Sequence, residues 1–264
     1  MNNNTFPHVF VDSAESLQSA IFHLSHCTAM AFDTEGKDLG RSGPLTIATF
    51  LPMEPATAAG AVAYVVDVQA LGRDRVFTAD SFSLRNILED PDIQKYTFDC
   101  RTDSDALYHQ FGVYLRGVED MQVLEQAIRI HRGFPPPRRT YTHRNGERIP
   151  YLSGMAKICA KYAGESPSGH LFTGPMRVDH SVWHIRPLPS ESISYAAKDV
   201  YIIKFLRDIF SRVPLSETLL EAVKVHSEMY EWYFRDSDRE ISRETDMDFI
   251  LEEHSIVPVE EYPT

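Results

Sequence analysis

The stretch that decides the fold is residues 31–36, AFDTEG, which continues an apolar run that begins at Ala29. A short apolar run bounded by polar residues and glycine is typical of a buried strand. Asp33 and Glu35 are two positions apart, so both carboxylates point to the same face of such a strand. Burying two like charges side by side is unfavourable unless a cation lies nearby. The pair therefore indicates either a cation site or an exposed strand end with two solvated acids.

Two further segments carry acids in suggestive positions. Asp103 closes the segment FDCRTD at 98–103, which opens a stretch with helical periodicity. Tyr195 and Asp199 stand four positions apart, so on a helix they share one face about one turn apart. A tyrosine with a pKa near 10 is a poor base at neutral pH, so its expected task is to orient a water that a metal has acidified. Taken singly, each of the two aspartates could also be an ordinary surface acid, and the tyrosine could be a half-buried core aromatic.

The apolar patterning along the chain predicts a mixed sheet flanked by helices. Strands come first as a meander and then alternate with helices, an order that favours an α/β fold. We expect the helix at 103–111 to begin at an acidic cap, and residues 131–150, which contain three consecutive prolines, to form a loop. The predicted strands are 9–13, 29–33, 45–51, 61–68 and 95–98. The first predicted helix begins near Ser13, and the others span 81–88, 103–111, 120–131, 152–162, 190–210 and 216–234.

Composition places the chain among soluble intracellular proteins. It has 264 residues, of which 43% are hydrophobic and 24% charged, enough to bury a sizeable core. No apolar run is long enough to span a membrane and the first residues do not form a signal peptide, so we expect a nuclear or cytoplasmic protein that is not secreted and contacts no membrane. The cysteines Cys27, Cys100 and Cys159 form no paired motif, which fits a reducing compartment.

The net charge of −12 argues at first against a nucleic-acid partner, because phosphate binding relies on Lys and Arg. However, residues 235–264 alone contain ten acids and three arginines, and part of the remaining charge is the proposed cation site, where bound ions would invert the local field. We expect weak binding through metals and a few arginines. We divide the chain into a domain at 1–214 and a C-terminal helix with an acidic tail, disordered or loosely docked, at 215–264.

Together, the acids resemble the three motifs of the DEDDy-type 3′-5′ exonucleases, which are ribonuclease D-like members of the ribonuclease H-like superfamily. The motifs are Asp33-x-Glu35, Asp103 and Tyr195-x-x-x-Asp199. The resemblance runs from about Val9 to Phe210 and is supported by the segment at 183–188, which precedes the third motif. The segments at 35–45 and 99–101 look closest to the Egalitarian-like eukaryotic subgroup. It implies a ribonuclease H-like mixed sheet flanked by helices, with an additional C-terminal helix and acidic tail. It also implies hydrolysis of 3′-terminal nucleotides with two divalent ions, Mg²⁺ or Mn²⁺.

The resemblance also implies a role for each residue of the set. Asp33 would bridge both metals. Glu35 and Asp199 would complete the tighter metal site, and Asp103 would support the second ion. Tyr195 would position the attacking water.

The second motif is open to two alternatives and one departure. Asp99 and Asp105 lie close to Asp103, which we prefer because it stands nine residues before Gly112, where the family's acid lies. Phe98 occupies the position at which the family usually has a histidine. This departure alters the surroundings of the motif and removes no ligand.

Substrate contacts are expected at two places. We assign them to Thr34 and Gly36, which flank the acids, and to the stretch 129–148, which holds six arginines against a single glutamate. Arginine forks fit phosphates and aromatic rings stack on unpaired bases, whereas the alternatives are a solvated loop or one that pairs with the acidic tail. The residues that we assign in this stretch are Arg138, Arg139, Tyr141 and Arg144.

These patterns lead to two hypotheses of different classes. The first is a metal-dependent exonuclease acting on 3′ ends of single-stranded RNA or DNA, with RNA slightly favoured. The second is a catalytically weak or silent exonuclease fold that binds RNA or scaffolds other proteins. The retained acids favour the enzyme, but contacts to the 2′-hydroxyl, a protein partner and a homo-oligomer all stay open. We expect the last helix, 216–234, to close the core rather than to form an interface.

Overall fold

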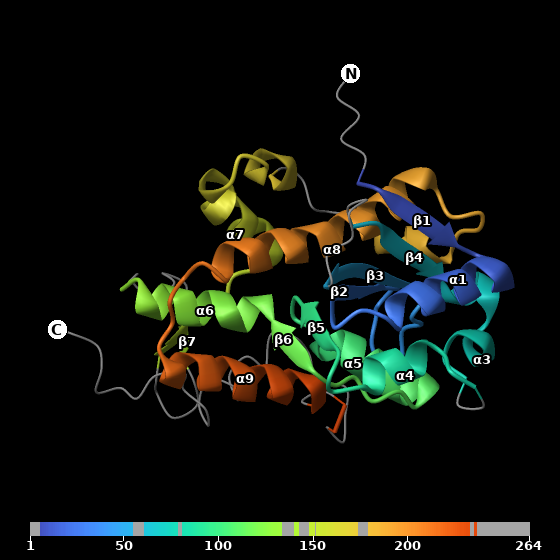
Figure 1. The fold of residues 1–264 in the computed structure, drawn as a ribbon, viewed down its shortest axis with the longest axis horizontal. Helices are drawn as coiled ribbons and strands as arrows, with labels where there is room; N and C mark the ends of the chain where they lie inside the picture. The colour runs from blue at the N-terminus through green and yellow to red at the C-terminus, as the bar shows by residue number, and fades with distance from the viewer. Residues whose placement is uncertain are drawn as a thin grey trace.

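The computed structural model describes residues 6–54, 61–78, 81–133, 140–142, 148–150, 152–173, 179–232 and 235–236. Its centre is a six-stranded mixed sheet in the order β1-β4-β3-β2-β5-β6 (Figure 1). The strands β2, β3 and β4 form an antiparallel meander, whereas β1, β5 and β6 run parallel to their neighbours. This confirms the predicted α/β class. The bounds are β1 His8–Val11, β2 Ala29–Glu35, β3 Ile47–Glu54, β4 Ala63–Asp67, β5 Gln94–Thr97 and β6 Val118–Asp120.

The strand β2 is longer than its neighbour β5, and this difference makes room for a site. Pairing with β5 covers only residues 29–31 of β2, whereas pairing with β3 continues to Glu35. The last residues of β2 therefore face the segment after β5, where the helix α5 (Arg101–Phe111) begins. Since a strand end without a sheet partner keeps free backbone groups, side chains from that helix can bond to it.

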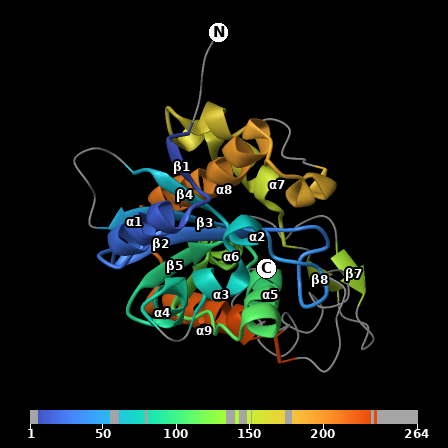
Figure 2. The same cartoon turned by 90° about the vertical axis from the view of Figure 1, so that its right-hand side faces the viewer.

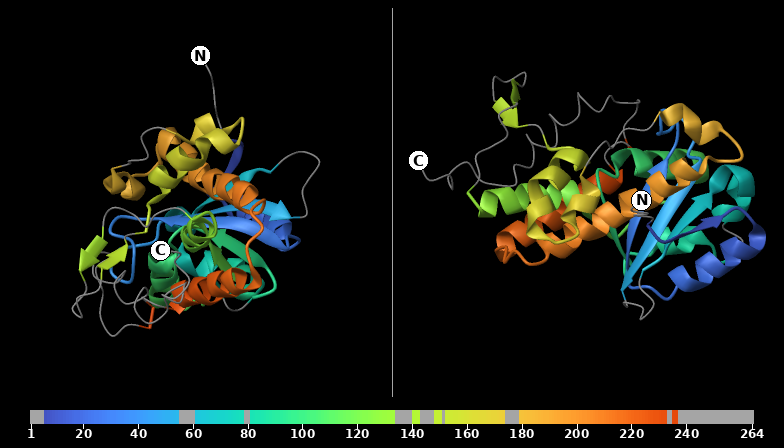
Figure 3. Two further views of the ribbon diagram at one scale, coloured as in Figure 1. Left: turned by 90° about the vertical axis from the view of Figure 1, so that its left-hand side faces the viewer. Right: turned by 90° about the horizontal axis from the view of Figure 1, so that it is seen from above.

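Helices cover both faces of the sheet. The long helix α8 (Ser190–Phe210) crosses β2, β3 and β4 on one face, as the view from above shows (Figure 3). On the other face lie α5 and α9, and α6 packs between α8 and α9 at the β6 edge (Figure 1). None of the described helices is long and apolar enough to span a bilayer. The remaining helices are α1 Ala14–Leu24, α2 Val68–Leu71, α3 Arg73–Val76, α4 Leu84–Glu89, α6 Met121–His131, α7 Met155–Tyr162 and α9 Glu217–Trp232, with 3-10 helices at Ala163–Glu165, Gly169–Phe172 and His180–His184.

Two expectations from the sequence are wrong in detail. The helix α5 has no acidic cap, because it begins at Arg101 after Cys100, whose side chain makes no capping hydrogen bond, and Asp103 lies inside its first turn. The stretch 131–150 is not only loop, since the strands β7 (Thr140–Thr142) and β8 (Arg148–Pro150) pair as an antiparallel hairpin. The hairpin stands apart from the main sheet (Figure 2). Two threonines and a tyrosine favour a strand here despite the nearby prolines and glycines.

The last helix, α9, packs against the core, as expected. The Ser104 hydroxyl of α5 donates to the carbonyl of Glu231, and the Asp120 N–H donates to Ser227 Oγ at 3.0 Å. The buried ring of Tyr230 lies 4.8 Å from the guanidinium carbon of Arg101. These contacts tie α9 to α5 and β6. The acidic tail at 237–264 lies outside the described residues.

Candidate active site

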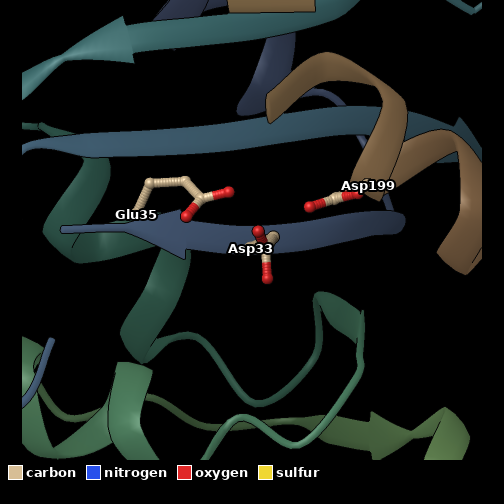
Figure 4. Close-up of side chains that lie close together, drawn as sticks. All are labelled: Asp33, Glu35 and Asp199. Atoms are coloured by element: carbon tan, nitrogen blue, oxygen red, sulfur yellow. The ribbon is translucent and has the colours of Figure 1, made fainter. Parts of the chain in front are cut away.

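Three carboxylates from two elements meet where β2 ends. Asp33 and Glu35 come from β2 and Asp199 comes from α8, and one oxygen of each lies within 4.8 Å of the others. Figure 4 shows the carboxylates of Glu35 and Asp199 directed toward each other along β2, beside Asp33. Glu35 and Asp199 are each only 7% exposed. The structure thus places the first and third motifs against each other.

The crowding of these acids disfavours their charged forms. Burial raises the pKa of Glu35 well above its ordinary value, and the charges of Asp33, Asp199 and Asp103 raise it further. Burial likewise raises the pKa of Asp199 to about 7, although Lys198 and the Tyr195 hydroxyl oppose the rise. Removing charged groups from water is unfavourable unless an opposite charge compensates. A bound cation would supply that compensation.

Asp103 reaches the same site from the opposite side of β2. Its Oδ1 accepts hydrogen bonds from the Thr34 N–H at 3.0 Å and from the Thr34 hydroxyl at 2.6 Å. Asp103 is outside the group of three carboxylates, but its charge acts on Glu35 and it lines the same cavity. The side chain of Thr34, which we expect to touch substrate, therefore holds Asp103 in place.

The two alternatives to Asp103 have other partners. The Arg41 Nη2 donates to Asp105 Oδ1 at 2.9 Å and the Arg41 N–H donates to Oδ2 at 2.6 Å. Asp99 accepts from Arg101 Nε at 2.6 Å, although it also lines the cavity. The geometry therefore favours Asp103 over Asp105 as the acid of the second motif.

Tyr195 lies one helical turn before Asp199 and hydrogen-bonds to its carboxylate. Its ring packs beside Trp183, with centroids 6.2 Å apart. Burial and the nearby carboxylates raise the pKa of the Tyr195 phenol far above its usual value. The phenol therefore stays protonated at neutral pH, and it can orient a water but cannot serve as its base.

These side chains line one cavity of about 360 Å³, which we call the acid pocket. Gly36 belongs to its lining, and a Cβ at that position would come within 2.1 Å of the Pro44 carbonyl, so only glycine allows the loop after β2 to close in. Several lining residues were not predicted to belong to the site. Phe98, Asp99 and Thr102 stand beside Asp103 in the segment FDCRTD, where only one acid was assigned as a ligand. Asp38, Leu39 and His180 also line the pocket, but their spacing in the sequence indicates no role.

Most of the predicted basic loop cannot be placed relative to this pocket. Arg138, Arg139 and Arg144 lie outside the described residues, and Tyr141 lies in β7 with no described side chain. At the start of the stretch, Arg132 Nη1 donates to Glu165 at 2.7 Å. The substrate contacts assigned to this loop therefore stay predictions.

The fold and the carboxylates at the end of β2 define a ribonuclease H-like α/β domain with a nuclease-type acid site. A family model described as 3′-5′ exonuclease matches residues 8–213. The chain belongs to this 3′-5′ exonuclease domain family, and the resemblance to DEDDy-type, ribonuclease D-like domains is confirmed.

Solved structures of ribonuclease D share this fold. RNase D of Trypanosoma brucei in complex with RNA U12 is 27% identical, with a TM-score of 0.66, over 91% of this chain and 74% of that one. Its GMP complex is 25% identical, with a TM-score of 0.66, over 94% and 72%. RNase D of Escherichia coli, at 18% identity and a TM-score of 0.57 over 87% and 51%, shares the fold.

Curated relatives carry the name piRNA biogenesis protein EXD1. The Xenopus laevis protein is 25% identical over 206 residues, which are 78% of this chain and 36% of the relative. The mouse protein is 34% identical over 107 residues, 40% of this chain and 17% of the relative. This chain thus spans only about a third or less of the relatives that it matches.

Proposed function

We propose that this chain is a metal-dependent exonuclease that hydrolyses the phosphodiester bond at the 3′ end of single-stranded nucleic acid, with RNA favoured over DNA. The observation that carries the proposal is the group of Asp33, Glu35 and Asp199, whose carboxylate oxygens lie within 4.8 Å of one another. Two of these acids are buried with raised pKa values. Such a group is stable and charged only next to cations.

The donor set fits divalent ions that prefer oxygen ligands. Carboxylates at this density suit Mg²⁺ or Mn²⁺, and we assign Asp33, Glu35 and Asp199 as ligands, with Asp103 supporting the second ion. When bound, a pair of such ions acidifies a water and stabilises the charge on the attacking and leaving oxygens. The donors thus have the chemistry that a two-metal mechanism requires.

The chain's own residues supply positioning. Tyr195, held by Asp199, directs its hydroxyl at the attacking water. Thr34 fixes Asp103 through two hydrogen bonds. Leu39 and Phe98 bring apolar surface to the acid pocket, where a terminal base can pack.

The preference for RNA rests on the relatives. RNase D of Trypanosoma brucei has been solved in complex with RNA U12, and the curated relatives are named for piRNA biogenesis. We also propose that the protein acts on RNA in the nucleus or the cytoplasm. We further propose that residues 1–214 form the catalytic domain. In the remaining segment, 215–264, the helix α9 packs against this domain and supports it.

The test is cleavage of a 5′-labelled single-stranded RNA and its DNA counterpart in Mn²⁺, Mg²⁺ or EDTA. We expect a ladder that shortens from the 3′ end, requires metal, is stronger on RNA and disappears in Asp33→Ala. The matched control is Asp12→Ala, which removes the same charge from an exposed position and should leave the ladder unchanged.

Two results would contradict the proposal. Intact substrates in every lane, with binding retained, would support the RNA-binding or scaffolding alternative. A ladder that survives Asp33→Ala would show that a contaminating nuclease produced it.

A further inference from the structure

A second cavity lies beside the acid pocket and has the opposite charge character. Its volume is about 610 Å³, and we call it the basic pocket. None of the described residues that line it is acidic, whereas six carboxylates line the acid pocket. Its titratable lining residues are Arg41, Arg73, His109 and His184.

Three segments of the chain run from one pocket to the other. The loop between β2 and β3 lines the acid pocket through Leu39 and the basic pocket through Arg41. The helix α5 contributes Asp103 to the first and Gln110 to the second, a separation of about 10 Å at 1.5 Å per residue. The 3-10 helix His180–His184 does the same with its first and last residues, about 8 Å apart at 2 Å per residue. The two pockets are therefore neighbours on one surface of the protein.

The arginines of the basic pocket are held in defined positions. Arg41 is fixed by hydrogen bonds from its Nε and Nη2 to Asp105 Oδ1, at 3.2 and 2.9 Å. The guanidinium carbon of Arg73 lies 5.2 Å from the centre of the Phe111 ring, and Arg73 is exposed. Guanidinium groups bind phosphate oxygens with two parallel hydrogen bonds, and positioning them in advance lowers the entropy lost on binding.

We propose that the basic pocket binds backbone phosphates of the same single strand whose 3′ end lies in the acid pocket. A stacked strand advances about 3.4 Å per nucleotide, so a separation of about 10 Å places these phosphates about three nucleotides upstream of the end. The inference rests on the proposed function and deepens it, because it defines a minimum substrate: a strand of about four or more nucleotides fills both pockets, whereas a shorter one fills only the first.

The experiment measures binding in Ca²⁺, an ion that oxygen ligands hold and that takes the place of the proposed Mg²⁺ or Mn²⁺ without supporting cleavage, so that its outcome does not depend on hydrolysis. A 5′-fluorescein 12-nucleotide RNA is titrated with wild type, Arg73→Gln and Arg75→Gln, followed by fluorescence anisotropy at several salt concentrations. Arg75 lies on the same short helix and is equally exposed, but it does not line the pocket. It is therefore a control with the same loss of charge. An unlabelled trinucleotide serves as a competitor for the acid pocket alone.

For Arg73→Gln we expect the Kd of the 12-mer to rise about tenfold, as for the loss of one charge-assisted hydrogen bond. The slope of log Kd against log salt should fall by about 0.7, the value for one phosphate contact on a single strand. Arg75→Gln should bind like wild type, and the trinucleotide should compete with unchanged affinity in all three proteins.

The proposal is overturned if the two variants weaken binding equally, if Arg73→Gln binds like wild type, if its affinity for the trinucleotide also falls, or if wild type does not bind the 12-mer. Failure of the proposed function has a different signature. In that case the 12-mer binds with the expected dependence on Arg73, but metal ions produce no cleavage.

Discussion

Two groups of buried carboxylates in this protein differ in what balances their charge. Asp67 accepts from Arg186 Nη2 at 2.7 Å, and Asp105 accepts from Arg41 Nη2 at 2.9 Å. Glu35 and Asp199 instead lie among other carboxylates, within 4.8 Å of Asp33. The fold thus provides arginines for acids that only hold loops in place. At the end of β2 it gathers acids with no arginine among them in the group of three, and this is where we propose that a cation binds.

The largest effect is expected when one of the gathered acids is neutralised. Glu35→Gln keeps the size of the side chain but removes one ligand charge, so cleavage of single-stranded RNA should fall about a thousandfold, roughly 4 kcal/mol of transition-state stabilisation. In EDTA the same variant should unfold at the same or a higher temperature than wild type, because one of several like charges is gone. If the variant loses activity and is also less stable than wild type without metal, Glu35 stabilises the fold by itself. It would then belong with the structural acids Asp67 and Asp105.

Asp120 is a third kind of buried acid, whose hydrogen-bond partners are neutral groups. Its effect on stability should therefore depend on pH. Its Oδ2 accepts from the Thr97 hydroxyl at 2.9 Å and from the Cys100 N–H at 3.2 Å, yet burial raises its pKa to about 6. An acid whose pKa is higher in the folded state than in the unfolded chain adds stability below the unfolded pKa, and this stability is lost as pH rises through the folded pKa. The free energy of unfolding of wild type relative to Asp120→Asn should therefore fall by about 3 kcal/mol between pH 3 and pH 8.

Urea unfolding at several pH values measures this difference. The exposed Asp92→Asn is the control and should follow wild type at every pH. A wild-type advantage over Asp120→Asn that is constant with pH would show that Asp120 keeps an ordinary pKa.

A somewhat smaller effect should follow from adding the proposed cation. Mn²⁺ at about one hundred times its dissociation constant should stabilise the folded chain by about 2.7 kcal/mol, which raises the melting temperature by about 5 to 10 °C for a chain of this size. Thermal scans with and without EDTA measure it. Glu35→Gln should lose most of the shift and Asp105→Asn should keep it; equal shifts in both variants would place the ion elsewhere.

The smallest effect is expected at the acids that already have arginines. Asp105→Asn keeps one oxygen acceptor for Arg41 but loses the charge and replaces the other acceptor with an NH2 group, and the pair is partly open to solvent. The free energy of unfolding should therefore fall by about 1 to 2 kcal/mol, measured in urea, with cleavage still present. Complete loss of cleavage in this variant would place Asp105 with Asp33, Glu35 and Asp199 among the acids of the site.

Much of the fold was predictable from sequence because the signals are local. The two-position spacing of Asp33 and Glu35 and the four-position spacing of Tyr195 and Asp199 depend on strand and helix periodicity alone. The strand β6 and the helices α2 and α3 have only three or four residues each, too few for any period to show.

The contents of the acid pocket were only partly predictable. The carboxylates stand at spacings that imply a shared face, whereas His180 and Phe98 reach the pocket through tertiary packing alone. The bond from Thr34 to Asp103 joins residues 69 positions apart, and no pattern in one sequence shows such a pairing. The prediction of an acidic cap for α5 was wrong because the Asp103 carboxylate accepts hydrogen bonds from β2 instead of from its own helix.

The docking of α9 has a consequence for how the protein is made. The family model ends at residue 213, but Ser227 and Tyr230 cover β6 and the first turn of α5, the turn that carries Asp103. During translation these residues leave the ribosome after every acid of the site has already emerged. Until then, the part of α5 that α9 covers is open. The nascent chain therefore carries all the proposed ligands before the helix that completes their scaffold has emerged.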